Sequence, residues 1–201
     1  MTGQIYVISG PSGAGKSTII RSLRDKTSDL VYSISHTSRG PRGKEEAGVH
    51  YHFVDRTTFR AMIEDGAFLE WARVYDDYYG TAYSSIEDQL DSGNDVIMDL
   101  DPQGAKNIKK AHPASILIFI LPPSYEALEK RLRERATEEE RAIQSRLQKA
   151  HRQLMECVHY DYLIVNDILD KASSEAAAVI TANRCAKARR LSEIEKIFKL
   201  Q

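Results

Sequence analysis

Five short runs of apolar residues, rich in β-branched side chains, recur along the chain and predict buried strands. They are Gln4–Ser9, Val31–Ser35, Asp95–Leu100, Ile116–Leu121 and Tyr162–Val165. Apolar residues at helical spacing predict helices at Lys16–Lys26, from Ser124 through Leu132, from Thr137 through Leu154, and at Ser173–Ala188. Strands that alternate with helices predict an α/β fold, with a five-stranded parallel sheet flanked by helices on both faces.

The stretch of residues 36–91 has a different texture. Aromatic residues are dense there, charged residues alternate with them, and no long apolar run occurs. We therefore expect an inserted lobe of short strands and helices at 36–91, which interrupts a core of residues 1–35 and 92–201. The last stretch, 183–201, is expected to be a packing helix, with self-association as the alternative. Its apolar positions are Leu191, Ile194 and Ile197.

The charge balance argues against several classes of partner. Lys and Arg number 28 and Asp and Glu number 29, for a net charge of -1, so we expect binding neither to nucleic acid nor to a membrane. The longest apolar run, Ile116–Leu121, is far shorter than the ~20 residues of a membrane span. Cys157 and Cys185 lack a metal-binding spacing and suit a reducing compartment, so we expect a cytoplasmic protein. The sequence leaves open whether it is a monomer or a homodimer.

One motif carries a specific chemistry. Gly10-Pro11-Ser12-Gly13-Ala14-Gly15-Lys16-Ser17 matches the pattern G-x-x-x-x-G-K-[ST], directly after a predicted strand and at the start of a predicted helix. Glycines let backbone N–H groups turn toward phosphate oxygens, and the lysine adds charge at the β- and γ-phosphates. The motif predicts an ATP site with Mg²⁺ held by Ser17 and, through water, by Asp99 at the end of a strand. The N-K-x-D sequence by which GTPases read guanine does not occur, which argues against a switch GTPase.

A second set of residues suits another anionic substrate. Arg39 and Arg42 lie three apart in a loop with Gly and Pro, where two guanidinium groups can converge on one phosphate. Five further motifs follow the P-loop Gly10–Thr18: Ser35-x-x-x-Arg39-x-x-Arg42, Gly48-x-x-Tyr51-x-Phe53-Val54, Phe68-Leu69-Glu70-Trp71, Tyr79-Gly80-Thr81 and Asp99-x-Asp101-x-Gln103-Gly104. In this order and spacing they resemble the guanylate kinase family, over about residues 4–167.

The resemblance implies a P-loop nucleoside monophosphate kinase with a GMP-binding lobe at 36–91 and a lid at about 135–146. Its reaction would be ATP + GMP = ADP + GDP, with Mg²⁺ as cofactor, ATP as phosphate donor and GMP as the second small-molecule substrate. The implied catalytic residues are Lys16, Arg39, Arg135, Arg146 and Asp99. The implied ATP-binding residues are Gly10, Pro11, Ser12, Gly13, Ala14, Gly15, Lys16, Ser17, Thr18 and Asn166. The implied GMP-binding residues are Ser35, Arg39, Arg42, Tyr51, Glu70, Tyr79, Thr81 and Asp101.

The role of Glu70 also has independent chemical support. Guanine presents two adjacent donors, the N1–H and the exocyclic amine, which a carboxylate accepts as a pair. Adenine presents an acceptor at N1, which would leave Glu70 repelled and unpaired. The chain departs from the family pattern at Gly43-Lys44, where Pro-Gly is frequent, and at Ala136, where glycine is frequent. Neither departure removes a charged or hydroxyl group.

Two alternatives remain open at this stage. A kinase of another phosphorylated small molecule, such as a ribose bisphosphate, would not need the guanine-reading residues Ser35, Glu70 and Thr81. A non-catalytic domain of this fold that holds peptides would not need the phosphate-binding residues Lys16, Arg39 and Arg42. Both sets are present, which favours the kinase of GMP.

Overall fold

The structure is a computed structural model of the chain and describes residues 3–74, 76–135 and 140–200. Its core is a parallel sheet whose five strands stand in the order β2-β7-β1-β8-β9. The strands are β1 (Ile5–Ser9), β2 (Leu30–Tyr32), β7 (Asp95–Asp99), β8 (Ile116–Leu121) and β9 (Tyr162–Val165). The prediction of a five-stranded parallel sheet is therefore confirmed, with strand ends within a few residues of those expected.

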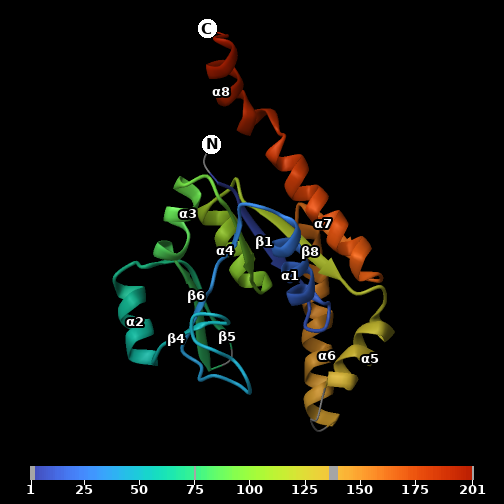
Figure 1. Cartoon of the computed structure of the whole chain (residues 1–201). Coiled ribbons are helices and arrows are strands. Elements are labelled where there is room, and N and C mark those ends of the chain that lie inside the picture. Colours follow the sequence, from blue (N-terminus) through green and yellow to red (C-terminus); the bar gives the residue numbers. More distant parts are fainter. Residues whose placement is uncertain (1–2, 75, 136–139, 201) are drawn as a thin grey trace.

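Helices cover both faces of this sheet, as the continuous apolar strands require. On one face, α1 (Lys16–Lys26) and α7 (Leu169–Arg184) pack against alternate strand residues such as Tyr6 and Ile8. On the other face, α4 (Pro102–Ala111) packs with the short α3 (Glu87–Asp91) against Ile5 and Val7. Figure 1 shows these two helical layers on either side of β1 and β8.

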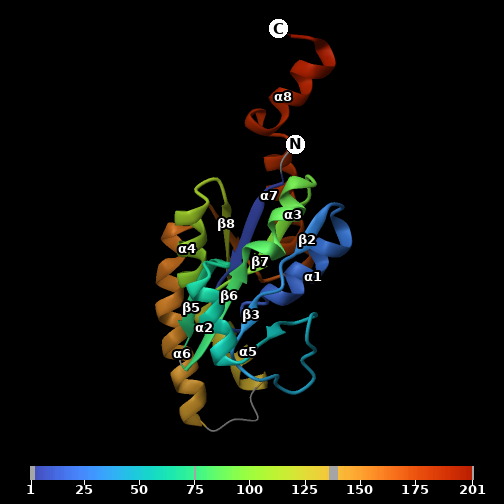
Figure 2. The ribbon, with the colours of Figure 1, turned by 90° about the vertical axis from the view of Figure 1, so that its left-hand side faces the viewer.

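A second sheet lies within the segment expected to form the lobe. Its strand order is β4-β3-β6-β5, and only β3 and β4 pair in parallel. The strands are β3 (His36–Thr37), β4 (His52–Phe53), β5 (Phe68–Val74) and β6 (Asp77–Ala82). Helix α2 (Arg56–Glu64) covers it through the buried Phe59, and a 3-10 turn, η1 (Tyr83–Ser85), leads back toward α3. Figure 1 shows this sheet and α2 beside the core, and Figure 2, turned by 90°, shows them in front of it.

Two helices stand at the end of the molecule that faces away from the chain termini (Figure 1). They are α5 (Tyr125–Arg135) and α6 (Glu140–Met155), followed by the 3-10 turn η2 (Glu156–His159). The side chain of Ser124 accepts the Ala127 N–H at 3.1 Å, which confirms the predicted helix start. Of the apolar residues that predict the second helix, Ile143, Leu147 and Ala150 are buried against α5, and Leu154 is partly buried beside them. The predicted first residue of this helix, Thr137, lies outside the described residues.

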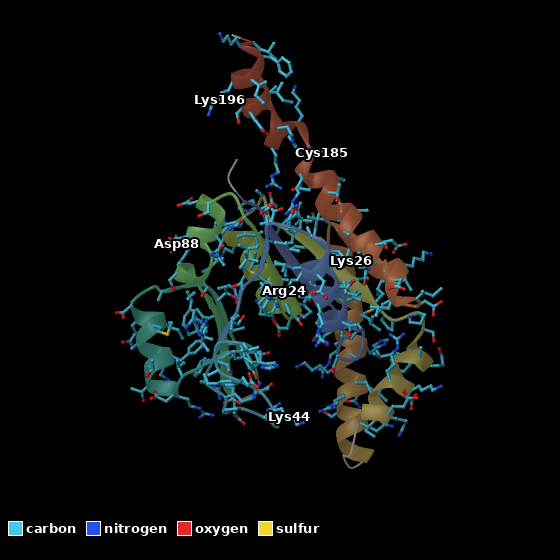
Figure 3. All side chains as sticks on the ribbon, viewed as in Figure 1. Arg24, Lys26, Lys44, Asp88, Cys185 and Lys196 are labelled. Atoms are coloured by element: carbon cyan, nitrogen blue, oxygen red, sulfur yellow. The ribbon has the colours of Figure 1, made fainter. Side chains whose placement is uncertain are left out.

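The C-terminal region differs from the expectation. The alanine-rich helix is not Ser173–Ala188 but α7, which ends at Arg184, and a second helix, α8 (Lys187–Phe198), starts after a bend at Cys185 and Ala186. A helix in this stretch is therefore confirmed, but no residue of α8 is buried, so the expectation that its apolar side chains pack against the body is wrong. Figure 3 shows Cys185 at the junction and Lys196 on the helix that projects from the body. The alternative, self-association, stays untested.

Candidate active site

The phosphate loop has the local structure that its sequence predicts. It leaves β1 at Ser9, and α1 begins at Lys16, directly after Gly15 in the left-handed region at φ 91°. A Cβ on Gly15 would lie 2.2 Å from the Asn166 side-chain nitrogen, so only glycine fits. The Lys16 ammonium donates to the Gly10 carbonyl at 3.0 Å and lies over the loop.

The charges of α1 suit an anion at its first turn. That turn carries no acidic residue, while the last turn carries Arg24 and Lys26. Figure 3 labels both of these basic residues on the helix. Since the N-terminal end of a helix has a partial positive charge and exposed N–H groups, the loop and this helix together can bind phosphate oxygens.

The end of β9 supports the loop from behind. The Asn166 side chain is buried and donates from its amide nitrogen to the Ala14 carbonyl at 2.7 Å. The Asn166 carbonyl in turn accepts a hydrogen bond from Arg131 of α5 at 3.0 Å. The family resemblance implies that Asn166 binds ATP. Its contact with the loop gives it a structural role, and the contact with ATP stays a prediction. Arg131 is half-buried.

Asp99 lies beside the P-loop lysine. It ends β7, pairs in register with Ile8 of β1, and its carboxylate is 3.9 Å from the Lys16 ammonium. Burial raises the pKa of Asp99, and the positive charge of Lys16 counteracts this in part. Ser17 and Thr18 are exposed on the first turn of α1. A hydroxyl and a carboxylate are the oxygen ligands that Mg²⁺ prefers, so the donor set at this edge fits that ion.

One cleft of about 470 Å³ joins the P-loop to the second sheet and to α6. Ten of the predicted site residues line it: Gly10, Ser12, Lys16, Ser35, Tyr51, Glu70, Tyr79, Asp99, Asp101 and Arg146. The sequence reasoning missed six others: Ala72, Val74, Leu100, Gly104, Lys149 and Gln153. The helical spacing of Lys149 and Gln153 after Arg146 could have indicated them, because residues three, four and seven apart share a helix face.

Glu70 presents a buried carboxylate to this cleft. It is 5% exposed, and its side chain accepts a hydrogen bond from the buried Thr81 hydroxyl at 2.9 Å. Burial raises the pKa of Glu70 to about 7, with a smaller contribution from the charge of Asp101 and an opposing one from Thr81. Thr81 thus holds Glu70 in place from β6, while Glu70 lines the cleft.

The start of α4 approaches Glu70 closely. Asp101 caps this helix by accepting the Gly104 N–H at 2.9 Å, with Pro102 at the first helical position. A Cβ on Gly104 would lie 3.1 Å from the Glu70 Oε2 atom, so glycine permits the approach. This packing fixes the distance between the Glu70 carboxylate and α4.

Arg39 contacts two residues of the cleft wall, Tyr51 and Tyr79. It is 8% exposed, and its Nε donates to the Tyr79 hydroxyl at 3.1 Å. Its two terminal nitrogens donate to Glu45 at 2.7 and 3.0 Å, a bidentate ion pair that sequence reasoning missed. The Tyr51 ring lies 5.3 Å from the guanidinium, and burial raises the pKa of the Tyr51 hydroxyl.

Two further predicted arginines, Arg42 and Arg135, are not among the described residues that line the cleft. Arg42 is exposed on the same loop as Glu45, and Gly43 beside it adopts a positive φ of 56°, which glycine tolerates. Arg135 ends α5, and its side chain lies outside the described part, as does Ala136.

Within the described residues, no group of three or more His, Cys, Asp or Glu side chains could hold a metal ion. No helix in that part of the chain is both long and apolar enough to cross a membrane.

A P-loop between the central strand and first helix of a parallel sheet, facing a second small sheet across one cleft, defines the class of P-loop nucleoside monophosphate kinases. The family model for guanylate kinase matches residues 2–183. The chain therefore belongs to the guanylate kinase family, and it is an enzyme, a phosphotransferase.

Known proteins similar to this chain agree. A guanylate kinase of Carboxydothermus hydrogenoformans is 47% identical over 90% of this chain and 89% of its own length. One of Syntrophotalea carbinolica is 45% identical over 98% of this chain and 93% of its own length. The crystal structure of guanylate kinase from Anaplasma phagocytophilum is similar to this structure with a TM-score of 0.81 at 29% sequence identity. The match covers 100% of this chain and 97% of the Anaplasma chain.

Proposed function

We propose that this chain phosphorylates GMP to GDP with ATP as the donor, and that both substrates bind in the cleft described above. The observation that carries this is the cleft itself, which brings the P-loop lysine Lys16 and the buried carboxylate Glu70 to one cavity. The first group suits the phosphates of a nucleotide, and the second suits the donor edge of guanine.

On the donor side, the loop Gly10–Thr18 binds the phosphates of ATP through its backbone N–H groups, and Lys16 adds its charge. Ser17, and Asp99 through water, would hold Mg²⁺, which when bound neutralises phosphate charge. Arg135 and Arg146 add cationic charge from the lid at 135–146, and Asn166 contacts the base of ATP. Support comes from Arg146, which lines the cleft from α6.

On the acceptor side, Glu70 accepts the N1–H and the exocyclic amine of guanine, while Ser35 and Thr81 provide hydroxyls near guanine O6. Asp101 is a further acid of this site. Arg39, Arg42, Tyr51 and Tyr79 bind the phosphate of GMP. These residues come from the lobe at 36–91, apart from Ser35 and Asp101 in the flanking core segments, so the lobe carries most of the recognition of GMP.

The reaction is an in-line phosphoryl transfer. An oxygen of the GMP phosphate attacks the γ-phosphorus of ATP, a new P–O bond forms, and the bond to the β,γ-bridging oxygen breaks with its electron pair leaving on ADP. The protein positions the two substrates and stabilises the charge that spreads over the γ-phosphate oxygens. Lys16, Arg146 and Arg39 are the candidates for that stabilisation.

We also propose that the protein works in the cytoplasm, because the exposed thiol of Cys185 suits a reducing compartment.

The test is the rate of ADP formation with ATP and Mg²⁺, measured with GMP, AMP, UMP or no acceptor. We expect GMP to be the preferred acceptor by at least about a hundredfold, because Glu70 meets a pair of donors only on guanine. The rate without acceptor should be near zero. Equal rates with GMP and AMP, or equal rates with and without GMP, would contradict the proposal.

A further inference from the structure

The arginine proposed to bind the GMP phosphate is already engaged by an internal carboxylate. Glu45 accepts two hydrogen bonds from the Arg39 terminal nitrogens, at 2.7 and 3.0 Å. It also accepts the backbone N–H of Arg42 at 2.8 Å. These bonds lower the pKa of Glu45, chiefly through the bond with Arg39, so the carboxylate is ionised at neutral pH.

Few donors of Arg39 are left for a substrate. A guanidinium carries five N–H groups, and in this structure Arg39 directs its Nε to Tyr79, its Nη1 to the Gly40 carbonyl and to Glu45, and its Nη2 to Glu45. Only one N–H, on Nη2, stays available by this count. A phosphate can therefore bind two N–H groups of Arg39 only if one of these partners releases it, and Glu45 accepts two of the four hydrogen bonds.

The position of the pair fits this conclusion. Tyr51 and Tyr79 line the cleft. Arg39 is not among the described residues that line it. The guanidinium lies 5.3 Å from the Tyr51 ring and 5.9 Å from the Phe53 ring, and it is 8% exposed. Glu45 thus holds Arg39 back from the cavity that the acceptor nucleotide would enter.

The groups that Glu45 binds are those that a phosphate would bind. A phosphate monoester offers several anionic oxygens, which match a guanidinium fork and a neighbouring backbone N–H, as a carboxylate does with two. We propose that Glu45 is an internal substitute for the acceptor phosphate on Arg39, and that GMP binds by displacing the Glu45 carboxylate. This inference rests on the proposed function, since it concerns the phosphate site of the acceptor.

The exchange has a consequence for specificity. Arg39 is nearly buried, and a buried guanidinium without an anion is costly, so Glu45 stabilises the site before substrate enters. A phosphate carries more negative charge than a carboxylate and can replace it, whereas a nucleoside cannot. Glu45 therefore makes the site selective for the phosphorylated acceptor and lowers the affinity for GMP by competing with it.

The test compares Glu45→Gln with Glu46→Gln, an exposed neighbour that loses the same charge. Dissociation constants for GMP and for guanosine are measured by calorimetry. We expect Glu45→Gln to bind GMP about tenfold more tightly, which is the worth of roughly one charge-assisted hydrogen bond, with guanosine unchanged. Glu46→Gln should match the natural chain for both ligands. Unchanged or weaker binding of GMP by Glu45→Gln would overturn the proposal and make Glu45 a positioning residue.

A second variant guards against a folding defect. Glu45→Asp keeps the charge but shortens the side chain, so it should lose the two-point grip and shift GMP affinity in the same direction by a smaller factor. Thermal unfolding should show a larger stabilisation by GMP in Glu45→Gln than in the natural chain; an equal or smaller one also contradicts the exchange. If the natural chain binds no GMP, the proposed function fails, whereas GMP binding without these shifts overturns only the role of Glu45.

Discussion

At the residue scale, the ionisation of Glu70 is tied to guanine binding. Burial raises the pKa of Glu70 from 4.5 to about 7, so the folded chain keeps a proton there that the unfolded chain loses. Between these two values the folded chain binds more protons, and this residue therefore lowers stability as the pH rises through that window. Guanine needs the ionised carboxylate, so its binding should show the opposite trend.

We predict that affinity for guanosine rises between pH 6 and pH 8 and levels off above the pKa of Glu70. Guanosine is the appropriate probe because the phosphate of GMP itself titrates near pH 6. Calorimetric titrations at several pH values would check this, with Glu70→Gln as the control, whose profile should be flat. An affinity for guanosine that does not change with pH in the natural chain would show that Glu70 is not the acceptor.

Also at the residue scale, the sequence predicted the site residues that belong to recognisable motifs. Lys16, Asp99, Glu70 and Arg146 all line the cleft. It did not find the Glu45–Arg39 pair, because a loop gives no periodicity from which a contact between two charges can be inferred. The link from Asn166 to Ala14 was missed for a related reason, since it joins residues 152 positions apart.

At the scale of elements, the strands of the core were predictable because both of their faces are buried, which leaves a continuous apolar run. The strands β3 and β4 have two residues each, too few for any alternation to show. The break between α7 and α8 has no glycine or proline to mark it. It is held instead by contacts across the fold, which the sequence does not display.

Those contacts converge on Asp95. This residue is 1% exposed and accepts hydrogen bonds from Arg184 at 2.7 Å and from Arg189 at 2.9 Å, on the two sides of the break. Its carboxylate also accepts the Gln4 backbone N–H at 2.8 Å. One buried acid thus ties the C-terminal helices to the start of β1 and to β7.

We predict that Asp95→Asn lowers the free energy of unfolding by about 3 kcal/mol, because two arginines lose a buried counter-charge. Urea denaturation would measure this. Asp88→Asn is the control, since Asp88 is exposed on α3 (Figure 3) and should change stability by at most about 0.5 kcal/mol. Equal losses in the two variants would mean that the Asp95 cluster does not anchor α7 and α8.

At the scale of the whole molecule, the residues proposed to recognise GMP and the residues proposed to bind the ATP phosphates belong to different sheets. The core sheet carries the P-loop and Asp99, while the second sheet provides Glu70, Tyr79 and Thr81, and Tyr51 directly precedes its strand β4. The two meet where α4 packs on β5, beside Gly104. A change in the second sheet should therefore alter which acceptor is used, and a change in the P-loop should alter the rate for every acceptor.

The most direct measurement is kcat/KM for GMP and for AMP in the natural chain, in Glu70→Gln and in Lys16→Ala. Glu70→Gln should reduce the preference for GMP over AMP by roughly 10–100-fold, since an amide offers one acceptor and presents an NH₂ to a donor. Lys16→Ala should lower both values by at least about a hundredfold and leave their ratio unchanged. If Glu70→Gln keeps the full preference for GMP, or if Lys16→Ala keeps near-normal turnover, then the assignment of acceptor and donor sites to this cleft is wrong.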